Sequence, residues 1–362
     1  MLEHSSLGRL FVGLAVMVLL VGCASGASSP RAPASSSPAA SPSVEAAESS
    51  PSAPAATPSP SPGIVKTANV SYESANPVLV PGELDVYAPA NAGPWPVVVM
   101  FHGAPGSDPA TDRGYESGPA RKVAGLGFVV FNASWGHLPG SMPAVPGNDW
   151  LQANNAQGAC AVEFARAHAA EYGGDPGTMI VFGHSGGAHI AAAATFARPE
   201  PTAGCLGGTT LGEIDALVTW EGNWLFSNNV PDWDSALAAD PRIMDTATPW
   251  SYLAEHNDQK VVMLVSDKPG IPEREVGDPW AADSWLAVRD PSGDLRRQLE
   301  ANGALADGTV GQPDADQLLF SVLKAQGNPV SLDVMPGSSH ASLGRDGWKV
   351  FLAAFPKAAA KD

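Results

Sequence analysis

One stretch of the chain joins a strand-like run to a helix-like run through a single serine. Residues 180–194 read IVFGHSGGAHIAAAA, with β-branched residues first and alanines last. A tight strand-to-helix turn exposes a serine hydroxyl, but the bend leaves no room for side chains two residues before and after it, where Gly183 and Gly187 stand. The small residues that follow let the helix pack close to a sheet, with its first N–H groups directed at Ser185. The stretch therefore favours an α/β protein in which Ser185 is a nucleophile.

Short apolar runs alternate with helical patterns elsewhere in the chain, which indicates a mostly parallel sheet with helical crossovers. Eight runs read as strands, the first two as an antiparallel start: 68–72, 84–87, 96–101, 128–132, 179–182, 216–220, 261–265 and 330–334. Four segments read as helices: 154–172, 187–197, 314–326 and 347–359. Two stretches without periodicity, 221–257 and 268–313, read as insertions at strand ends, where functional loops are common.

The N-terminal part of the chain reads as an export signal and a tether. The apolar run 11–21 is about half the roughly 20 residues that span a bilayer, and it ends at Gly22-Cys23. This end resembles a bacterial lipobox, which implies that residues 1–22 are a signal peptide and that Cys23 carries lipid. Residues 23–63 are almost only Ser, Pro and Ala, a composition typical of a disordered tether. We expect an exported protein, anchored by lipid to the outer face of a bacterial cell membrane, with one domain over 64–362.

Charge and cysteine content narrow the possible partners. The net charge is −17, so no basic face for nucleic acid is expected. Of the three cysteines, Cys160 and Cys205 remain beside Cys23, and an exported pair is a candidate disulfide. No Cys/His cluster has zinc spacing, so neither a metal nor a cofactor is expected. The sequence leaves the oligomeric state open.

Beyond the serine turn, residues 81–354 resemble the α/β-hydrolase fold, and the stretch AVEFARAHAAEYGGDPGTMIVFGHSGGAHIAAAA is similar to bacterial carboxylesterases and feruloyl-esterase-like hydrolases. The resemblance implies an oxyanion hole made by the N–H of Gly186 and a second N–H from the FHGAPG loop. His102-Gly103 matches the family's His-Gly pair, which makes Ala104 the second donor, although the family usually has another glycine there.

A catalytic histidine is expected on a loop after the last strand, and of the eight histidines His340 fits this place. The fold implies an acid after the seventh strand, where Asp267 stands, although the family's Gly-x-x-Asp spacing is absent. Glu221, after the sixth strand, is the first rival, followed by Glu275 and Asp278. His102 reads as a brace for its loop, and the remaining histidines outside the serine turn read as surface or packing residues: His137, His168 and His256.

A pocket wall is expected from His184 and from the tryptophans of the strand-end loops, with Trp135 and Trp224 as substrate-binding candidates; the others are Trp150, Trp220, Trp280 and Trp285. Packing of these tryptophans under the insertions is the alternative. The favoured function is a serine esterase that uses Ser185, His340 and Asp267 on a small or polymer-linked ester. A peptidase or lactone hydrolase on the same residues is one alternative, and a non-catalytic surface lipoprotein is the other.

Overall fold

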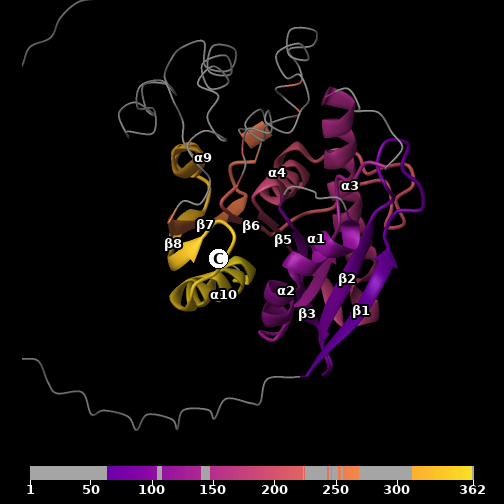
Figure 1. Cartoon of the computed structure of the whole chain (residues 1–362), viewed down its shortest axis with the longest axis horizontal. Coiled ribbons are helices and arrows are strands. Elements are labelled where there is room, and N and C mark those ends of the chain that lie inside the picture. Colours follow the sequence, from indigo (N-terminus) through magenta and orange to yellow (C-terminus); the bar gives the residue numbers. More distant parts are fainter. Residues whose placement is uncertain are drawn as a thin grey trace, which may run out of the picture. The chain divides into compact units, whose positions relative to one another are not determined.

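An eight-stranded sheet forms the centre of the protein, with the strand order β1-β2-β4-β3-β5-β6-β7-β8 (Figure 1). The strands are β1 (Ile64–Ser71), β2 (Glu83–Pro89), β3 (Trp95–Phe101), β4 (Val129–Ala133), β5 (Gly174–His184), β6 (Ala216–Trp220), β7 (Lys260–Lys268) and β8 (Val330–Ser339). β2 pairs antiparallel with both β1 and β4, and the remaining pairs are parallel. All eight predicted strands are present, and the predicted antiparallel start is confirmed.

This computed structural model describes residues 63–103, 108–139, 147–222, 256–268 and 312–360, together with 224, 243, 246, 252 and 253. These residues belong to one compact unit, Ser59–Asp362. The predicted signal peptide, Cys23 and nearly all of the tether lie outside the described residues. So do most of the insertion 221–257 and nearly all of the insertion 268–313. Within the described part of the chain, no helix is both long and apolar enough to cross a bilayer.

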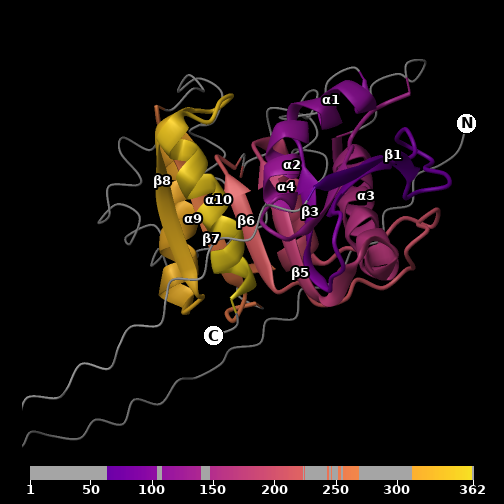
Figure 2. The ribbon, with the colours of Figure 1, turned by 90° about the horizontal axis from the view of Figure 1, so that it is seen from below.

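Helices cover both faces of the sheet. Alternate residues of the central strands point to opposite sides, so each face presents apolar side chains that the helices bury. Val97 and Val99 of β3 lie in one apolar cluster with residues of α3 (Gly147–His168), α4 (Gly186–Ala192) and α9 (Gln312–Gln326). Val98 and Met100 lie in a second cluster with residues of α2 (Ser117–Ala124) and α10 (Arg345–Ala359). Figures 1 and 2 show α2 and α10 together on one side of the strands. A sheet buried on both faces explains the continuous apolar runs in the sequence.

Two short helices were not predicted from the sequence. α1 (Pro109–Tyr115) and α2 follow one another between β3 and β4. They are 7 and 8 residues long, and each contains a glycine and a proline, so both are too short and too interrupted to be recognised from a helical repeat. Asp108 caps α1 by accepting hydrogen bonds from Thr111, at 2.8 Å from its backbone nitrogen and 2.6 Å from its hydroxyl. The other four predicted helices are present, although the one after Ser185 changes from α4 to a π-helical turn over Ala193–Ala197.

The predicted disulfide is confirmed: Cys160 of α3 is bonded to Cys205, with Cα atoms 5.4 Å apart. Cys205 lies in the segment that follows the π-helical turn, and it forms an isolated bridge with Glu73. The bond closes a loop of 45 residues. In the chain-entropy model such a cross-link stabilises a fold by about 4 kcal/mol. It therefore fixes α3 to the segment between α4 and β6.

Candidate active site

Ser185 stands on a sharp turn between β5 and α4, and its backbone has φ 52° and ψ −121°. A positive φ at a residue with a side chain costs about 1–3 kcal/mol, so the surrounding structure has to hold it. A Cβ on Gly183 would overlap the backbone of Gly187 and Ala188, and a Cβ on Gly187 would overlap the carbonyl oxygen of His102. Both glycines are therefore required by the turn, as the sequence predicted. Ser185 itself is half-buried, so its side chain reaches solvent.

The helix after the serine is buried on all sides. Every residue of α4 is buried, and the alanines at 188, 191 and 192 lie between the sheet and α3. On α3, a Cβ at Gly158 would overlap the side chain of Ile190, which shows how closely α3 and α4 approach. Larger side chains at these positions would push α4 away from the sheet and displace the turn. The alanine run therefore keeps α4 close to the sheet and so holds Ser185 in its position.

Glu221 is the carboxylate that contacts the predicted base. The Nδ1 atom of His340 lies 2.6 Å from Oε2 of Glu221. The other carboxylate oxygen, Oε1, accepts a hydrogen bond from the backbone nitrogen of Ser266 at 2.8 Å. Because each oxygen has its own donor, the carboxylate is held in one orientation. With its proton on Nδ1, the imidazole keeps Nε2 as the nitrogen that can accept a proton.

The environment of Glu221 keeps it ionised at neutral pH. Burial by itself raises the pKa of this carboxyl. Hydrogen bonds from His340 and Ser266, together with the attraction of the His340 charge, outweigh burial and lower the pKa below its usual range. The carboxylate therefore stabilises a positive charge on His340.

Asp267, predicted as the acid, points elsewhere. β7 continues to Lys268, so Asp267 lies within the strand and not on a loop after it. The pairing of β7 with β8 is irregular between Ser266 and Lys268, and at this point Oδ2 of Asp267 accepts a hydrogen bond from the backbone nitrogen of Gly337 at 2.8 Å. Asp267 thus fixes the β8 backbone three residues before His340, and its prediction as the acid in contact with the base is wrong. The two remaining rivals, Glu275 and Asp278, lie outside the described residues.

His184 connects the serine turn to the histidine loop. Its Nε2 lies 2.7 Å from the backbone oxygen of His340, and its Nδ1 lies 3.1 Å from Oε1 of Glu116. Its ring stacks on Trp220, with centroids 4.0 Å apart. The backbone nitrogen of Ser185 donates to the carbonyl oxygen of Trp220 at 2.9 Å. His184 is therefore bound to the backbone of the predicted base, and Ser185 to the end of β6.

A cavity of about 410 Å³ opens beside the serine turn. Its lining includes His102, Gly103, Glu116, His184, Trp220 and Trp348. A Cβ added to Gly103 would lie 3.6 Å from the Cβ of Ser185, so Gly103 of the cavity lining adjoins the nucleophile candidate. The lining combines two tryptophans with a few polar groups, which is typical of a small-molecule site.

Two of the predicted pocket residues are buried instead. Trp135 is 1% exposed and stacks on His102, and its Nε1 donates to the backbone oxygen of His102 at 3.0 Å. Trp224 is 0% exposed, and its Nε1 donates to Oδ1 of Asp316 at 2.6 Å. The prediction that these two bind substrate is wrong for this structure, because both side chains are packed inside the protein. His184 does line the cavity, as predicted.

Only one of the two predicted donors of the oxyanion hole lies among the described residues. Gly186 is buried and is the first residue of α4, directly after Ser185. Ala104 lies outside the described residues, so its role stays a prediction. The cavity residues that sequence reasoning missed include Glu116, at the junction of α1 and α2, and Trp348 of α10. Neither follows a strand or a motif, so the sequence carried no signal for them.

One cluster among the described residues has the composition of a metal site: His102, Asp112 and His137. Burial lowers the pKa of His102 to about 4, so its imidazole is neutral at pH 7. Burial also lowers the pKa of His137, although the adjacent Asp112 carboxylate opposes the shift. Neutral imidazole is the form that binds metals.

Comparisons with known proteins agree with this architecture. A model of the BD-FAE family, an esterase-like α/β-hydrolase family, matches residues 84–204. An esterase from the planctomycete Thermogutta terrifontis, Est2 with propionate bound, superposes with a TM-score of 0.53 at 17% identity, over 82% of this chain and 93% of that one. The same esterase phosphonylated by sarin gives a TM-score of 0.52 at 18% identity, over 83% and 95% of the two chains. The predicted α/β-hydrolase fold is therefore confirmed.

Proposed function

We propose that this protein is a serine hydrolase of carboxylic esters, with Ser185 as nucleophile, His340 as base and Glu221 as acid. The observation that carries the proposal is the contact of 2.6 Å between His340 Nδ1 and Glu221 Oε2. This contact stands at the end of β6, beside the strand that presents Ser185. The matching BD-FAE family and the Thermogutta esterase, which reacts with sarin, support the same chemistry.

The reaction follows from these positions. His340 Nε2 takes the proton of Ser185 as its oxygen attacks the ester carbonyl, and Glu221 stabilises the resulting imidazolium. The N–H of Gly186 and a second N–H from the loop after β3 stabilise the negative charge on the carbonyl oxygen. His340 then donates the proton to the departing alcohol, which leaves an acyl group on Ser185. Water activated by His340 releases the acid, and no cofactor takes part.

A non-catalytic role does not explain the turn. The positive φ of Ser185 and the two glycines that permit it are costly features, and a protein that only binds has no use for them. The buried carboxylate of Glu221 likewise has a purpose only if the imidazole acquires charge.

The test is a chromogenic ester panel of increasing acyl length, run with the wild-type chain and Ser185→Ala. Propionyl and butyryl esters come first, because the Thermogutta esterase was captured with propionate and with butyrate. We expect hydrolysis by the wild-type chain, loss of at least about 10⁴-fold in turnover in Ser185→Ala, and labelling of Ser185 by a fluorophosphonate. Activity that survives the substitution would remove Ser185 as nucleophile. Matched anilides in the same panel distinguish esters from amides.

We also propose that the enzyme acts outside the cytoplasm as a lipoprotein, with residues 1–22 removed and Cys23 acylated. The support is the Gly22-Cys23 end of the apolar run and the Ser/Pro/Ala composition that follows it. Labelling of cells with a palmitate analogue tests this: the chain should acquire label, and Cys23→Ser should not. An unlabelled wild-type chain in the soluble fraction would contradict the proposal.

A further inference from the structure

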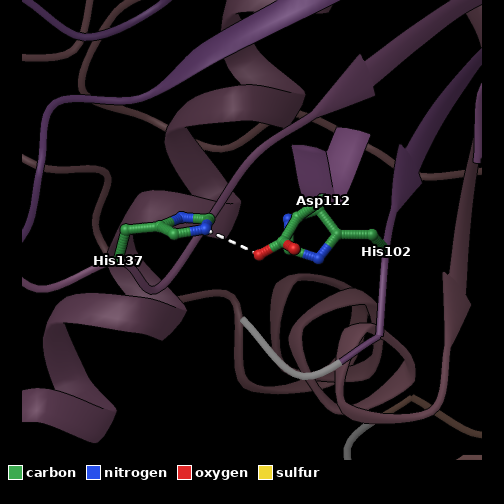
Figure 3. A group of neighbouring side chains, drawn as sticks. All are labelled: His102, Asp112 and His137. Atoms are coloured by element: carbon green, nitrogen blue, oxygen red, sulfur yellow. Dashed lines mark hydrogen bonds and ion pairs between the residues drawn. The ribbon is translucent and has the colours of Figure 1, made fainter. Parts of the chain in front are cut away.

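Three buried side chains from separate segments converge near the end of β3. His102 directly follows β3, Asp112 lies in α1, and His137 lies after β4. Each offers one ligand atom, and these atoms all lie within 4.8 Å of one another. Figure 3 shows the His137 ring directed at the Asp112 carboxylate, with His102 entering from the other side of the view. The exposed fractions are 1% for His102, 4% for Asp112 and 5% for His137.

The orientation of His102 is that of a metal ligand. Its Nδ1 lies 2.8 Å from the backbone oxygen of Gly103. A carbonyl oxygen only accepts, so Nδ1 carries the proton and Nε2 keeps its lone pair. Nε2 is buried and has no hydrogen-bond partner among the described residues. Metal-bound histidines characteristically donate their other ring N–H to a carbonyl or carboxylate, which fixes the tautomer in this way.

The other two ligand atoms already face each other. His137 Nε2 and Asp112 Oδ2 are 2.8 Å apart. Two ligands around a tetrahedral zinc ion lie about 3.4 Å apart, since each is about 2.0–2.2 Å from the metal. A separation of this size is reached by small side-chain shifts from the present distances. When an ion enters, His137 takes the tautomer that carries its proton on Nδ1, so that Nε2 and the Asp112 carboxylate both have a lone pair for the metal.

The surrounding charges tolerate a cation. Arg113 follows Asp112 and is also buried, but its guanidinium lies 3.3 Å from Glu83 and 3.7 Å from Asp85. These two carboxylates compensate the arginine. The Asp112 charge therefore does not have to neutralise Arg113 alone.

We propose that His102, Asp112 and His137 bind a divalent transition-metal ion of the zinc class. Two imidazoles and one carboxylate suit zinc, whereas calcium and magnesium prefer oxygen ligands throughout. His102 also lines the cavity beside Ser185, which gives the ion a route from solvent. The bound ion joins the segment after β3, α1 and the segment after β4, and so holds His102 and Gly103 in place beside Ser185. This site does not depend on the proposed esterase activity.

The test uses the full chain, purified without a histidine tag and stripped of metal by a chelator. Zinc is added, and the bound zinc is measured by calorimetry and by elemental analysis after gel filtration. We expect one zinc ion per chain and a rise in melting temperature of about 5 °C at saturating zinc. Cobalt in place of zinc should give visible absorption bands of a nitrogen- and oxygen-ligated ion of low coordination number.

His137→Gln is the variant that should lose the ion, with affinity reduced at least about 100-fold. His168→Gln is the matched control, because His168 also contacts a carboxylate, Glu171, at 2.8 Å, but on the surface. This control should bind zinc as the wild-type chain does. Equal zinc binding by His137→Gln, or a wild-type chain with neither stoichiometric zinc nor the cobalt spectrum, would overturn the proposal. The wild-type measurements decide the question even if His137→Gln fails to fold.

Discussion

Two neighbouring turns at the same edge of the sheet hold the proposed nucleophile and the proposed acid, and they are encoded in different ways. Ser185 directly follows β5 and has φ 52°, and Glu221 directly follows the adjacent strand β6 and has φ 43°. The first turn can be recognised in the local sequence from its two glycines and the run of alanines that follows. The second has no such signature, and Glu221 is identified only by its contacts with Ser266 and His340, which come from β7 and from the loop after β8. Nucleophiles of this kind can therefore be recognised from a short motif, whereas the acid depends on how distant strands pair.

The largest effect should come from filling the first turn. Gly183→Ala places a Cβ against the backbone of Gly187 and Ala188, which cannot move away without displacing α4. We expect destabilisation of about 4 kcal/mol or more, or failure to fold, measured by urea unfolding. Gly118→Ala is the control, because a Cβ there meets no atom within 4 Å. Similar stability of the two variants would show that the turn is not sterically restricted.

At the second turn, the charge of the Glu221 side chain should matter and not its size. Glu221→Gln keeps the size of the side chain but removes the negative charge that stabilises the His340 imidazolium. We expect kcat to fall by about 10³- to 10⁴-fold with little change in KM, and Glu221→Asp to be intermediate. Steady-state kinetics on a chromogenic ester measure both. A loss of less than tenfold in Glu221→Gln would exclude Glu221 as the acid.

Loss of the contact between His184 and His340 should have a smaller effect. His184 donates through Nε2 to the backbone oxygen of His340 at 2.7 Å, and one such hydrogen bond contributes about 1 kcal/mol. His184→Ala should therefore lower kcat about five- to tenfold. His184→Gln should recover part of this loss, because the glutamine amide can replace Nε2, whereas the shorter His184→Asn should not. Equal kcat values for the three variants would show that His184 does not position the base.

His189, in the helix that follows Ser185, should make the stability of the fold depend on pH. Burial lowers the pKa of His189 from 6.5 to about 3 in the folded chain. The unfolded chain therefore takes up this proton first as the pH falls, so stability decreases from about pH 6.5 towards pH 3. His189→Met should reduce this decrease by about 1.4 kcal/mol per pH unit, measured by urea unfolding at pH 6.5, 5.5 and 4.5. Identical slopes for both chains would contradict the burial of a neutral His189, and His168→Gln, at a half-buried position, serves as control.

The sequence predicted the sheet, its antiparallel start, the serine turn and the disulfide, because each depends on local sterics or on a strong pattern. Asp267 was favoured over Glu221 because it stands near the end of a strand-like run. In the folded chain β7 extends past it, and the irregular pairing with β8 turns Asp267 toward Gly337. Trp135 and Trp224 were expected in a pocket because they follow strands, but hydrogen bonds to His102 and Asp316 hold them inside the protein. The cluster of His102, Asp112 and His137 has no metal-binding spacing in the sequence, because the fold brings its members together from three segments.

The rate at which a fluorophosphonate labels Ser185 tests most directly whether Glu221 activates the nucleophile through His340. The rate is measured by mass spectrometry of the peptide that contains Ser185, in the wild-type chain, Glu221→Gln and Asp267→Asn, with Ser185→Ala as the blank. The contacts of His340 predict labelling about 10³-fold slower in Glu221→Gln and within about threefold of the wild-type rate in Asp267→Asn. Slow labelling of Asp267→Asn together with normal labelling of Glu221→Gln would contradict the account and return the acid to β7.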